Sequence, residues 1–211
     1  WIDRAAALEL LDESPPQAVN NKALANAKPY INEHFIANSL RLIGVFNNLK
    51  IDFPEKKYTS FIGITPYSFD YPVYAKMYLD STERGRPFWY NLTYPQFNAR
   101  LHLSYYPIKS KNDFNELVED SRKLAFKHTV KATGIDEGTI KIPEHKVYGV
   151  YYTIEGNTAS SVQFFLTDSA KHYFRGALYF NERPQYDSIQ PVVKFIKQDI
   201  DKLIETFRWK D

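Results

Sequence analysis

The sequence predicts an α+β fold in which an antiparallel β-sheet is flanked by helices and preceded by a helical arm at the N-terminus. Short segments of alternating apolar and polar residues end at prolines, as half-buried strands do. These segments fall into two groups separated by one amphipathic helix, and a second helix with the strongest apolar periodicity of the chain closes the sequence. Strands in runs, instead of strict alternation with helices, favour an antiparallel sheet.

By its local amino-acid composition, the chain of 211 residues divides into an arm over residues 1–48 and an α+β domain over residues 49–211. The arm is rich in alanine and asparagine, whereas the domain is rich in β-branched and aromatic residues. Prolines interrupt the helical pattern of the arm. Three short helical segments are predicted there, at residues 5–11, 22–27 and 31–46.

The first group of strands alternates between apolar and polar positions, and each strand stops at a proline. The clearest strand has Leu101, Leu103 and Tyr105 on one face, and polar side chains on the other. Proline cannot donate a hydrogen bond to a neighbouring strand, so it is a common residue at strand ends. The predicted strands cover residues 49–53, 67–71, 88–94 and 99–106.

A long helix is predicted over residues 113–131, and a glycine-containing loop up to Pro143 follows it. Asp113 and Glu116 have the spacing of a capping box, although Ser110 could cap the helix instead. The face expected to point inward carries Phe114, Leu117, Val118, Ser121, Leu124, Ala125 and His128.

Three strands with short connections then form a predicted meander, at residues 147–154, 160–167 and 172–180. The middle strand places Val162, Phe164 and Leu166 on one side. The last predicted helix, residues 188–209, is a suitable cover for that side, with Ser188 as its cap. Its apolar stripe consists of Ile189, Val192, Val193, Ile196, Ile200, Leu203, Ile204 and Phe207.

Composition excludes several classes of function. The formal net charge is +2, from 27 basic and 25 acidic residues, and no basic run stands out, so we expect no nucleic-acid binding. The chain has no cysteine, which excludes thiolate catalysis and cysteine-ligated zinc. No stretch has the length and apolar character of a membrane span. Because the chain begins at Trp1 instead of Met, we expect a processed chain that has lost a targeting segment.

No residue is predicted to be catalytic, to ligate a metal or to bind a cofactor. The five histidines form no local metal motif, and the eight glycines form no phosphate-binding loop. Ser121 and His128 share a helical face, but seven residues place them about 10 Å apart, beyond hydrogen-bonding reach. A hydrolase would need a serine, a histidine and a carboxylate brought together from distant segments.

Aromatic residues make up 16% of the chain, and some of them lie next to prolines in a pattern typical of recognition loops. Packing within the sheet explains the same residues equally well. The candidates for partner binding are Tyr67, Tyr71, Tyr74, Phe88, Trp89 and Tyr90.

Three serines follow an aspartate and precede a small or apolar residue: Ser81, Ser169 and Ser188. Turn and cap chemistry explains this pattern, because Asp and Ser favour both. The pattern is also similar to the O-glycan acceptor motif of exported Bacteroidota proteins, so these serines are candidate O-glycosylation sites.

From about residue 50 to residue 210 the chain resembles the GldD family, the gliding-motility lipoproteins of Bacteroidota. Each motif alone is weak, but the motifs occur in order over three quarters of the chain. They are IDFPEKKY (51–58), PYSFDYPVYAK (66–76), HLSYYP (102–107), EDSRKLAFKHT (119–129), EHKVYG (144–149), GNTASSVQFFLTDSAKHYFRGALYFN (156–181) and ETFRWK (205–210). The order of the elements is also loosely similar to that of Mog1/PsbP-like domains.

The resemblance implies a non-enzymatic, periplasm-facing protein of the cell envelope that acts as an accessory or scaffold of the gliding-motility and type IX secretion machinery. Its partners would be membrane protein components of that machinery, and a lipid anchor is expected on a cysteine absent from this chain. The family brings no known catalytic residues. The alternative is a periplasmic module that binds a ligand or glycan through a pocket near Trp89, Tyr90 and Trp209.

Overall fold

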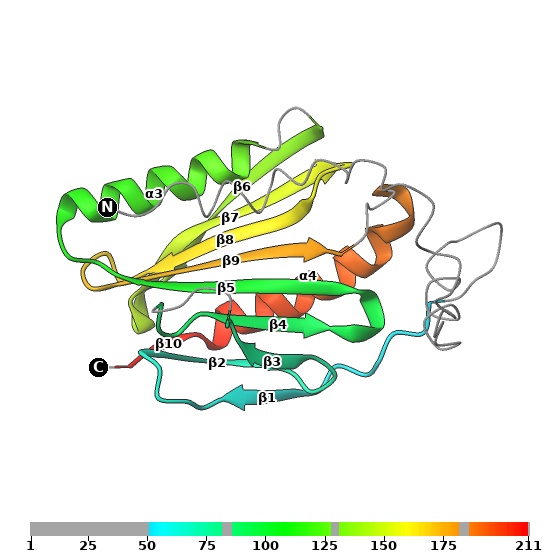
Figure 1. Cartoon of the computed structure of the whole chain (residues 1–211), viewed down its shortest axis with the longest axis horizontal. Coiled ribbons are helices and arrows are strands. Elements are labelled where there is room, and N and C mark those ends of the chain that lie inside the picture. Colours follow the sequence, from blue (N-terminus) through cyan, green and yellow to red (C-terminus); the bar gives the residue numbers. More distant parts are fainter. Residues whose placement is uncertain (1–50, 82–85, 128–130, 182–185, 211) are drawn as a thin grey trace, which may run out of the picture. The chain divides into compact units, whose positions relative to one another are not determined.

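The computed structural model confirms the α+β class and describes residues 51–81, 86–127, 131–181 and 186–210 (Figure 1). All of them belong to one unit, Leu42–Asp211. The predicted arm, with its three helical segments, lies outside the described residues.

Seven antiparallel strands form the main sheet, in the order β3-β4-β5-β9-β8-β7-β6. The predicted meander is present as β7, β8 and β9, which pair in sequence, and β9 also pairs with β5 along its whole length. The strands are β3 (Lys76–Leu79), β4 (Tyr90–Tyr94), β5 (Ala99–Pro107), β6 (Ala132–Ile142), β7 (Val147–Gly156), β8 (Ser160–Thr167) and β9 (His172–Phe180).

A smaller sheet has the order β1-β2-β10 and brings together the two ends of the described domain. Its strands are β1 (Tyr58–Phe61), β2 (Tyr67–Pro72) and β10 (Arg208–Trp209). In this sheet Trp209 lies opposite Tyr67. The short 3-10 helices η1 (Pro95–Phe97) and η3 (Pro143–His145) connect strands of the main sheet.

Helix α3 (Lys111–Phe126) covers one face of the main sheet. Ser110 is its N-cap, accepting a hydrogen bond from the backbone N–H of Asp113 at 3.1 Å, so the second of the two predicted caps is the correct one. Leu117 and Ala125 pack against Phe165 and Tyr173 of the sheet. The Tyr173 hydroxyl donates to Ser121 Oγ at 2.7 Å, which satisfies both polar groups inside this core.

Helix α4 (Tyr186–Thr206) and the small sheet cover the opposite face of the main sheet. Every residue of the predicted apolar stripe of α4 is buried. Val162, Phe164 and Leu166 belong to the same core as this stripe, which confirms the predicted pairing of meander and helix. Figure 1 shows α4 running behind β4 and β5, while α3 lies in front.

Several predicted boundaries were wrong. Of the predicted strand at residues 49–53, the described residues 51–53 form no strand. Residues 51–57 pack against α4 through Phe53 and Lys56, and the first strand begins at Tyr58. Helix α3 ends at Phe126 instead of Lys131. Helix α4 begins at Tyr186, so Ser188 lies inside it and is not its cap. The helix also ends earlier than predicted, because Arg208 and Trp209 pair with β2.

The predicted loop before Pro143 is the 11-residue strand β6 at one edge of the main sheet. Its first part, up to Gly138, has no regular apolar alternation, and only Thr139–Ile142 alternates, with Ile140 and Ile142 half-buried against the core. Its glycines do not interrupt pairing with β7, apart from an irregularity between Ala132 and Gly134.

Candidate functional site

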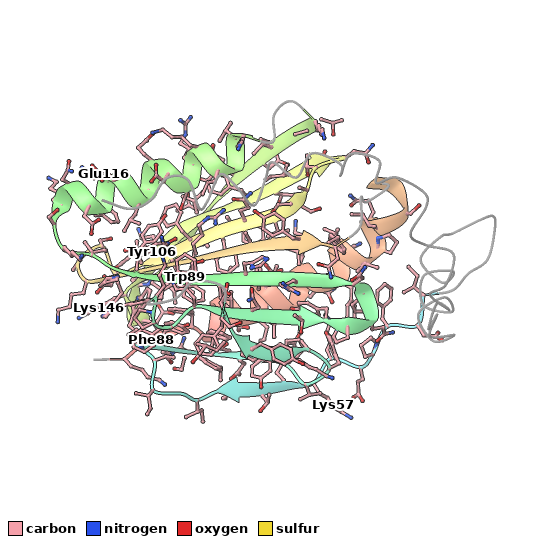
Figure 2. All side chains as sticks on the ribbon, in the orientation of Figure 1. Lys57, Phe88, Trp89, Tyr106, Glu116 and Lys146 are labelled. Carbon is pink, nitrogen blue, oxygen red and sulfur yellow. The ribbon has the colours of Figure 1, made fainter. Side chains whose placement is uncertain are left out.

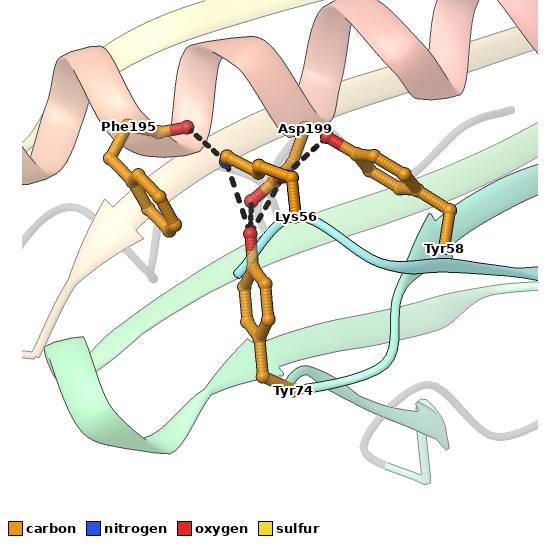
Figure 3. A network of polar contacts seen from close by, with 5 residues as sticks. All are labelled: Lys56, Tyr58, Tyr74, Phe195 and Asp199. Atoms are coloured by element: carbon orange, nitrogen blue, oxygen red, sulfur yellow. Dashed lines mark hydrogen bonds and ion pairs between the residues drawn. The ribbon is translucent and has the colours of Figure 1, made fainter. Parts of the chain in front are cut away.

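A buried carboxylate, Asp199 of α4, holds the first described segment of the domain in place (Figure 3). Its side chain is fully buried and accepts from Lys56 Nζ at 2.6 Å and from the Tyr58 hydroxyl at 3.1 Å. The Tyr74 hydroxyl donates to both carboxylate oxygens at 2.8 Å. We call Lys56, Tyr58, Tyr74 and Asp199 the Asp199 network.

Lys56 lies in the segment before β1 and contacts α4 at a second residue besides Asp199. Its ammonium donates to the Phe195 carbonyl at 2.7 Å and lies 3.3 Å from the centroid of the Phe195 ring. Two residue pairs nearby fix the same segment: Phe53 stacks on Phe195 with ring centroids 4.5 Å apart, and Gln96 Nε2 donates to the Asp52 carbonyl at 2.7 Å.

The electrostatics of the network keep the two tyrosines protonated at neutral pH. Burial lowers the pKa of Lys56, while its hydrogen bond and its attraction to Asp199 oppose that shift. Burial first, and then the charge of Asp199, raise the pKa of Tyr58 to about 12 and raise that of Tyr74 as well. The network therefore joins the segment before β1 to α4 through hydrogen bonds and an ion pair.

The sequence contains one signal of this network that pattern reasoning missed. Asp199 lies three residues after Ile196 and four before Leu203, within the apolar stripe of its helix. An acidic residue at such a position is buried and needs a partner. Its partner Lys56 lies 143 residues away and could not have been named from the sequence.

The predicted partner-binding residues fall in two places, and the prediction was wrong for Tyr67. Tyr67 is 0% exposed, and its hydroxyl donates to the Phe88 carbonyl at 2.6 Å, so its ring is not available to a partner. Tyr71 is half-buried against the core, and Tyr74 belongs to the Asp199 network. Partner binding by Tyr71 stays a prediction.

Phe88, Trp89 and Tyr90 lie where the chain enters β4. Phe88 has a φ of 68°, a left-handed conformation that bulky residues rarely adopt. Trp89 Nε1 donates to the Tyr105 carbonyl at 2.9 Å, and its ring meets that of Tyr106 edge to face. All three side chains are half-buried against the core, which leaves part of each ring at the surface. Figure 2 shows Phe88 and Trp89 near one end of the sheet.

The three candidate serines differ in their setting. Ser169 is exposed at the β8–β9 turn with a φ of 65°. Asp168 Oδ1 accepts from the backbone N–H groups of Ala170, Lys171 and His172 in this turn, so turn chemistry accounts for the aspartate. Ser81 and Ser188 are also exposed. Glycosylation of the three serines stays a prediction.

A shallow hollow of about 500 Å³ lies between α3 and the main sheet. It is lined by Phe114, Asn115, Val118, Glu119, Tyr148, Gly149, Phe165, Thr167 and Ser169. The alternative function placed a pocket near Trp89, Tyr90 and Trp209, but these rings pack against the core and do not line this hollow. The Trp209 ring stacks on His172 with centroids 5.1 Å apart.

The described residues bring no hydrolytic triad together around Ser121, whose hydroxyl accepts from buried Tyr173; His128 lies outside them. Within these residues, no group of three or more histidines and carboxylates could hold a metal ion. In the same part of the chain, no helix combines the length and the apolar character that crossing a membrane requires.

The sheet face beside α3 carries a titratable group that can be tested. Burial lowers the pKa of His102 to about 4 from an ordinary value of 6.5, and the positive charge of Arg100 acts in the same direction. The folded protein therefore favours the neutral ring. The contribution of the neutral His102 ring to the free energy of unfolding is complete above about pH 6.5 and is lost as the pH falls towards 4.

Between pH 7 and pH 4.5 we expect this one group to remove about 2 kcal/mol from the free energy of unfolding. Urea unfolding of the His102→Gln variant should show a correspondingly smaller loss than the wild type. His145→Gln in η3 is the matched control and should lose as much as the wild type. Equal losses in the wild type and His102→Gln would contradict the assignment.

Comparison with known proteins gives a family and one remote structural likeness. The solution structure of cyanobacterial PsbP (CyanoP) from Synechocystis sp. PCC 6803 is similar, with a TM-score of 0.42 and 13% identity over 79% of this chain and 98% of that one. No function is inferred from so remote a likeness. Among proteins of curated function none matches the chain. The family model described as gliding motility lipoprotein GldD matches residues 46–209. The chain therefore belongs to the GldD family of gliding motility lipoproteins, membrane-anchored proteins of the cell envelope with a role in motility.

Proposed function

We propose that this protein is a non-enzymatic accessory or scaffold component of the gliding-motility and type IX secretion machinery. The family match over residues 46–209 carries the proposal. The site geometry supports it, because the buried polar groups of the Asp199 network bind one another and hold the fold together. In this proposal the domain faces the periplasm of a Bacteroidota cell, held by a lipid on a cysteine outside this chain.

The partners in this proposal are membrane protein components of the same machinery. Two observations favour the end of the main sheet near Phe88 and Trp89 as their contact surface. Aromatic rings are half-exposed there, and Phe88 adopts a left-handed backbone conformation of the kind that clusters at functional sites. Rigid aromatic side chains are common anchors of protein interfaces.

Site-specific photo-crosslinking in cells tests the proposal. A crosslinking amino acid at Phe88 or Tyr71 should capture identified components of the gliding or secretion machinery. The same amino acid at Lys123, on the exposed face of α3, is the control and should not capture them. Crosslinks that are the same from all three positions, or that contain no such component, would count against the proposed function.

A further inference from the structure

The connection between β1 and β2 presents two isoleucines to solvent. Ile62 is 84% exposed and Ile64 is 98% exposed, with Gly63 between them. Large apolar side chains this exposed mark contact sites when they occur together instead of singly. We call Ile62–Gly63–Ile64 the apolar tip.

The backbone that carries the apolar tip is fixed by the C-terminal end of the domain. Lys210 donates its backbone N–H to the Pro66 carbonyl at 2.8 Å and its ammonium to the Gly63 carbonyl at 3.2 Å. On the other side of the loop, Thr65 Oγ1 donates to the Tyr67 carbonyl at 2.7 Å. Because the loop is already ordered, little further conformational entropy is lost when its side chains enter an apolar phase.

Basic and aromatic side chains surround the base of the apolar tip. Trp209 lies opposite Tyr67 in the small sheet, and its Nε1 donates to the carbonyl of exposed Lys146. Lys146, Arg208 and Lys210 are among the cations at this end, and Figure 2 labels Lys146 and Phe88 towards the same end of the domain. The neighbouring carboxylates include Glu144, exposed in η3, and Glu205, which pairs with Lys202 at 3.1 Å. Asp168 is also near, and it accepts from the backbone N–H of His172, whose ring stacks on Trp209.

A second apolar contribution comes from the edge of the main sheet. The Phe61 ring, next to Ile62 in sequence, meets the Tyr90 ring with centroids 4.9 Å apart. Tyr90 lies opposite Leu79 in the register of β3 and β4, and Leu79 is 61% exposed. The apolar surface thus extends from the tip towards the end of β3.

We propose that the apolar tip inserts into a lipid surface, with Lys146 and Lys210 contacting anionic headgroups around it. The isoleucine side chains offer no hydrogen bond or charge that would select one protein partner. Exposed aliphatic residues with lysines and a tryptophan at their base instead match the layering of a membrane, apolar inside and anionic at the headgroups. The contact is additional to the lipid anchor of the family. Figure 1 shows that the first described residues and the tip lie at opposite ends of β1.

Vesicle binding by the whole chain tests the proposal directly. The chain has no cysteine, so binding reports the protein surface and not an acyl anchor. With vesicles of phosphatidylethanolamine and phosphatidylglycerol, the Ile62→Ser/Ile64→Ser variant should bind about tenfold or more weakly than the wild type. Lys146→Gln and Lys210→Gln should weaken binding to these vesicles, and high salt should do the same. Neither the two lysine substitutions nor high salt should change binding to vesicles of neutral lipid alone.

The matched control is Val73→Ser, because Val73 is 54% exposed and lies at the far end of β2 from the tip. This variant should bind vesicles as the wild type does. The variants at Ile62, Ile64, Val73 and Lys146 should retain the wild-type unfolding midpoint, since these side chains are exposed. Lys210→Gln also removes the hydrogen bond to the Gly63 carbonyl, so its binding is compared with the wild type only after its unfolding midpoint has been measured. Absence of wild-type binding, or equal binding by the double variant, would overturn the lipid proposal. Crosslinks from the tip to a machinery component without vesicle binding would indicate a protein partner instead and leave the proposed function intact.

Discussion

Replacing Asp199 by Ala is expected to lower the free energy of unfolding by about 3–5 kcal/mol. The substitution leaves the ammonium of Lys56 partly buried without its counter-charge, and it removes the acceptor of the Tyr58 and Tyr74 hydroxyls. Unpaired polar groups in the interior cost their full desolvation energy. Urea unfolding at neutral pH, followed by circular dichroism, measures the effect.

Two further variants distinguish the effect of losing the Asp199 charge from the effect of any substitution in α4. Asp201→Ala, two residues along α4 at an exposed position, should change stability by less than about 1 kcal/mol. Lys56→Met and Asp199→Leu combined with Tyr58→Phe and Tyr74→Phe should restore a large part of the lost stability. This set removes the ion pair together with the two hydroxyls that would lose their acceptor, and apolar side chains of similar size often replace a buried ion pair without loss. A loss of less than about 1 kcal/mol in Asp199→Ala would show that the network contributes little.

Gly149→Ala is expected to destabilise the domain by about 3 kcal/mol or more, which lies at the upper end of overpacking substitutions. A methyl group at this position of β7 would lie 1.8 Å from the backbone oxygen of Phe165 in β8. The obstacle is main chain of a paired central strand, so it cannot move aside without disturbing the β7–β8 ladder. Thermal and urea unfolding should both show the loss, with reduced soluble yield.

Gly138→Ala provides the control within the adjacent strand. A methyl group there meets its nearest atom, the Tyr151 backbone oxygen, at 3.8 Å, an ordinary contact. Replacing a strand glycine without a clash reduces the entropy of the unfolded chain, so stability should be unchanged or slightly raised. Equal effects of the two substitutions would contradict the close approach of β7 and β8.

Elements buried on one face could be predicted from the sequence, whereas elements defined by tertiary contacts could not. The stripe from Ile189 to Phe207 shows a period of 3.6, and the positions Leu101, Leu103 and Tyr105 of β5 show a period of 2, and both report burial directly. Strand β8 is buried at all eight positions. Strand β6 was missed because its first seven residues show no such period and the alternation of Thr139–Ile142 is only four residues long. Strands β1 and β10 have four and two residues, too few for any period, and exist because they pair with β2.

The candidate sites show the same limit. Asp199 could have been recognised as an acid within an apolar stripe, but its partners come from segments remote in sequence. Ile62 and Ile64 look like core residues in the sequence, since nothing in their neighbours distinguishes an exposed isoleucine from a buried one. The family resemblance, carried by motifs spread over the domain, was the part of the functional prediction that comparison confirmed.

The small sheet and the Asp199 network join the beginning of the domain to its end, and this has a consequence for the order in which the chain folds. Strand β2 cannot complete its sheet until Arg208 and Trp209 are present, and Lys56 has no carboxylate partner until α4 has formed. Contacts so distant in sequence form slowly, because the entropy cost of closing a long loop comes before the contacts can stabilise the fold. During synthesis from the N-terminus, the β2–β10 pairing and the Lys56–Asp199 ion pair therefore cannot form until α4 and residues 208–209 have been added.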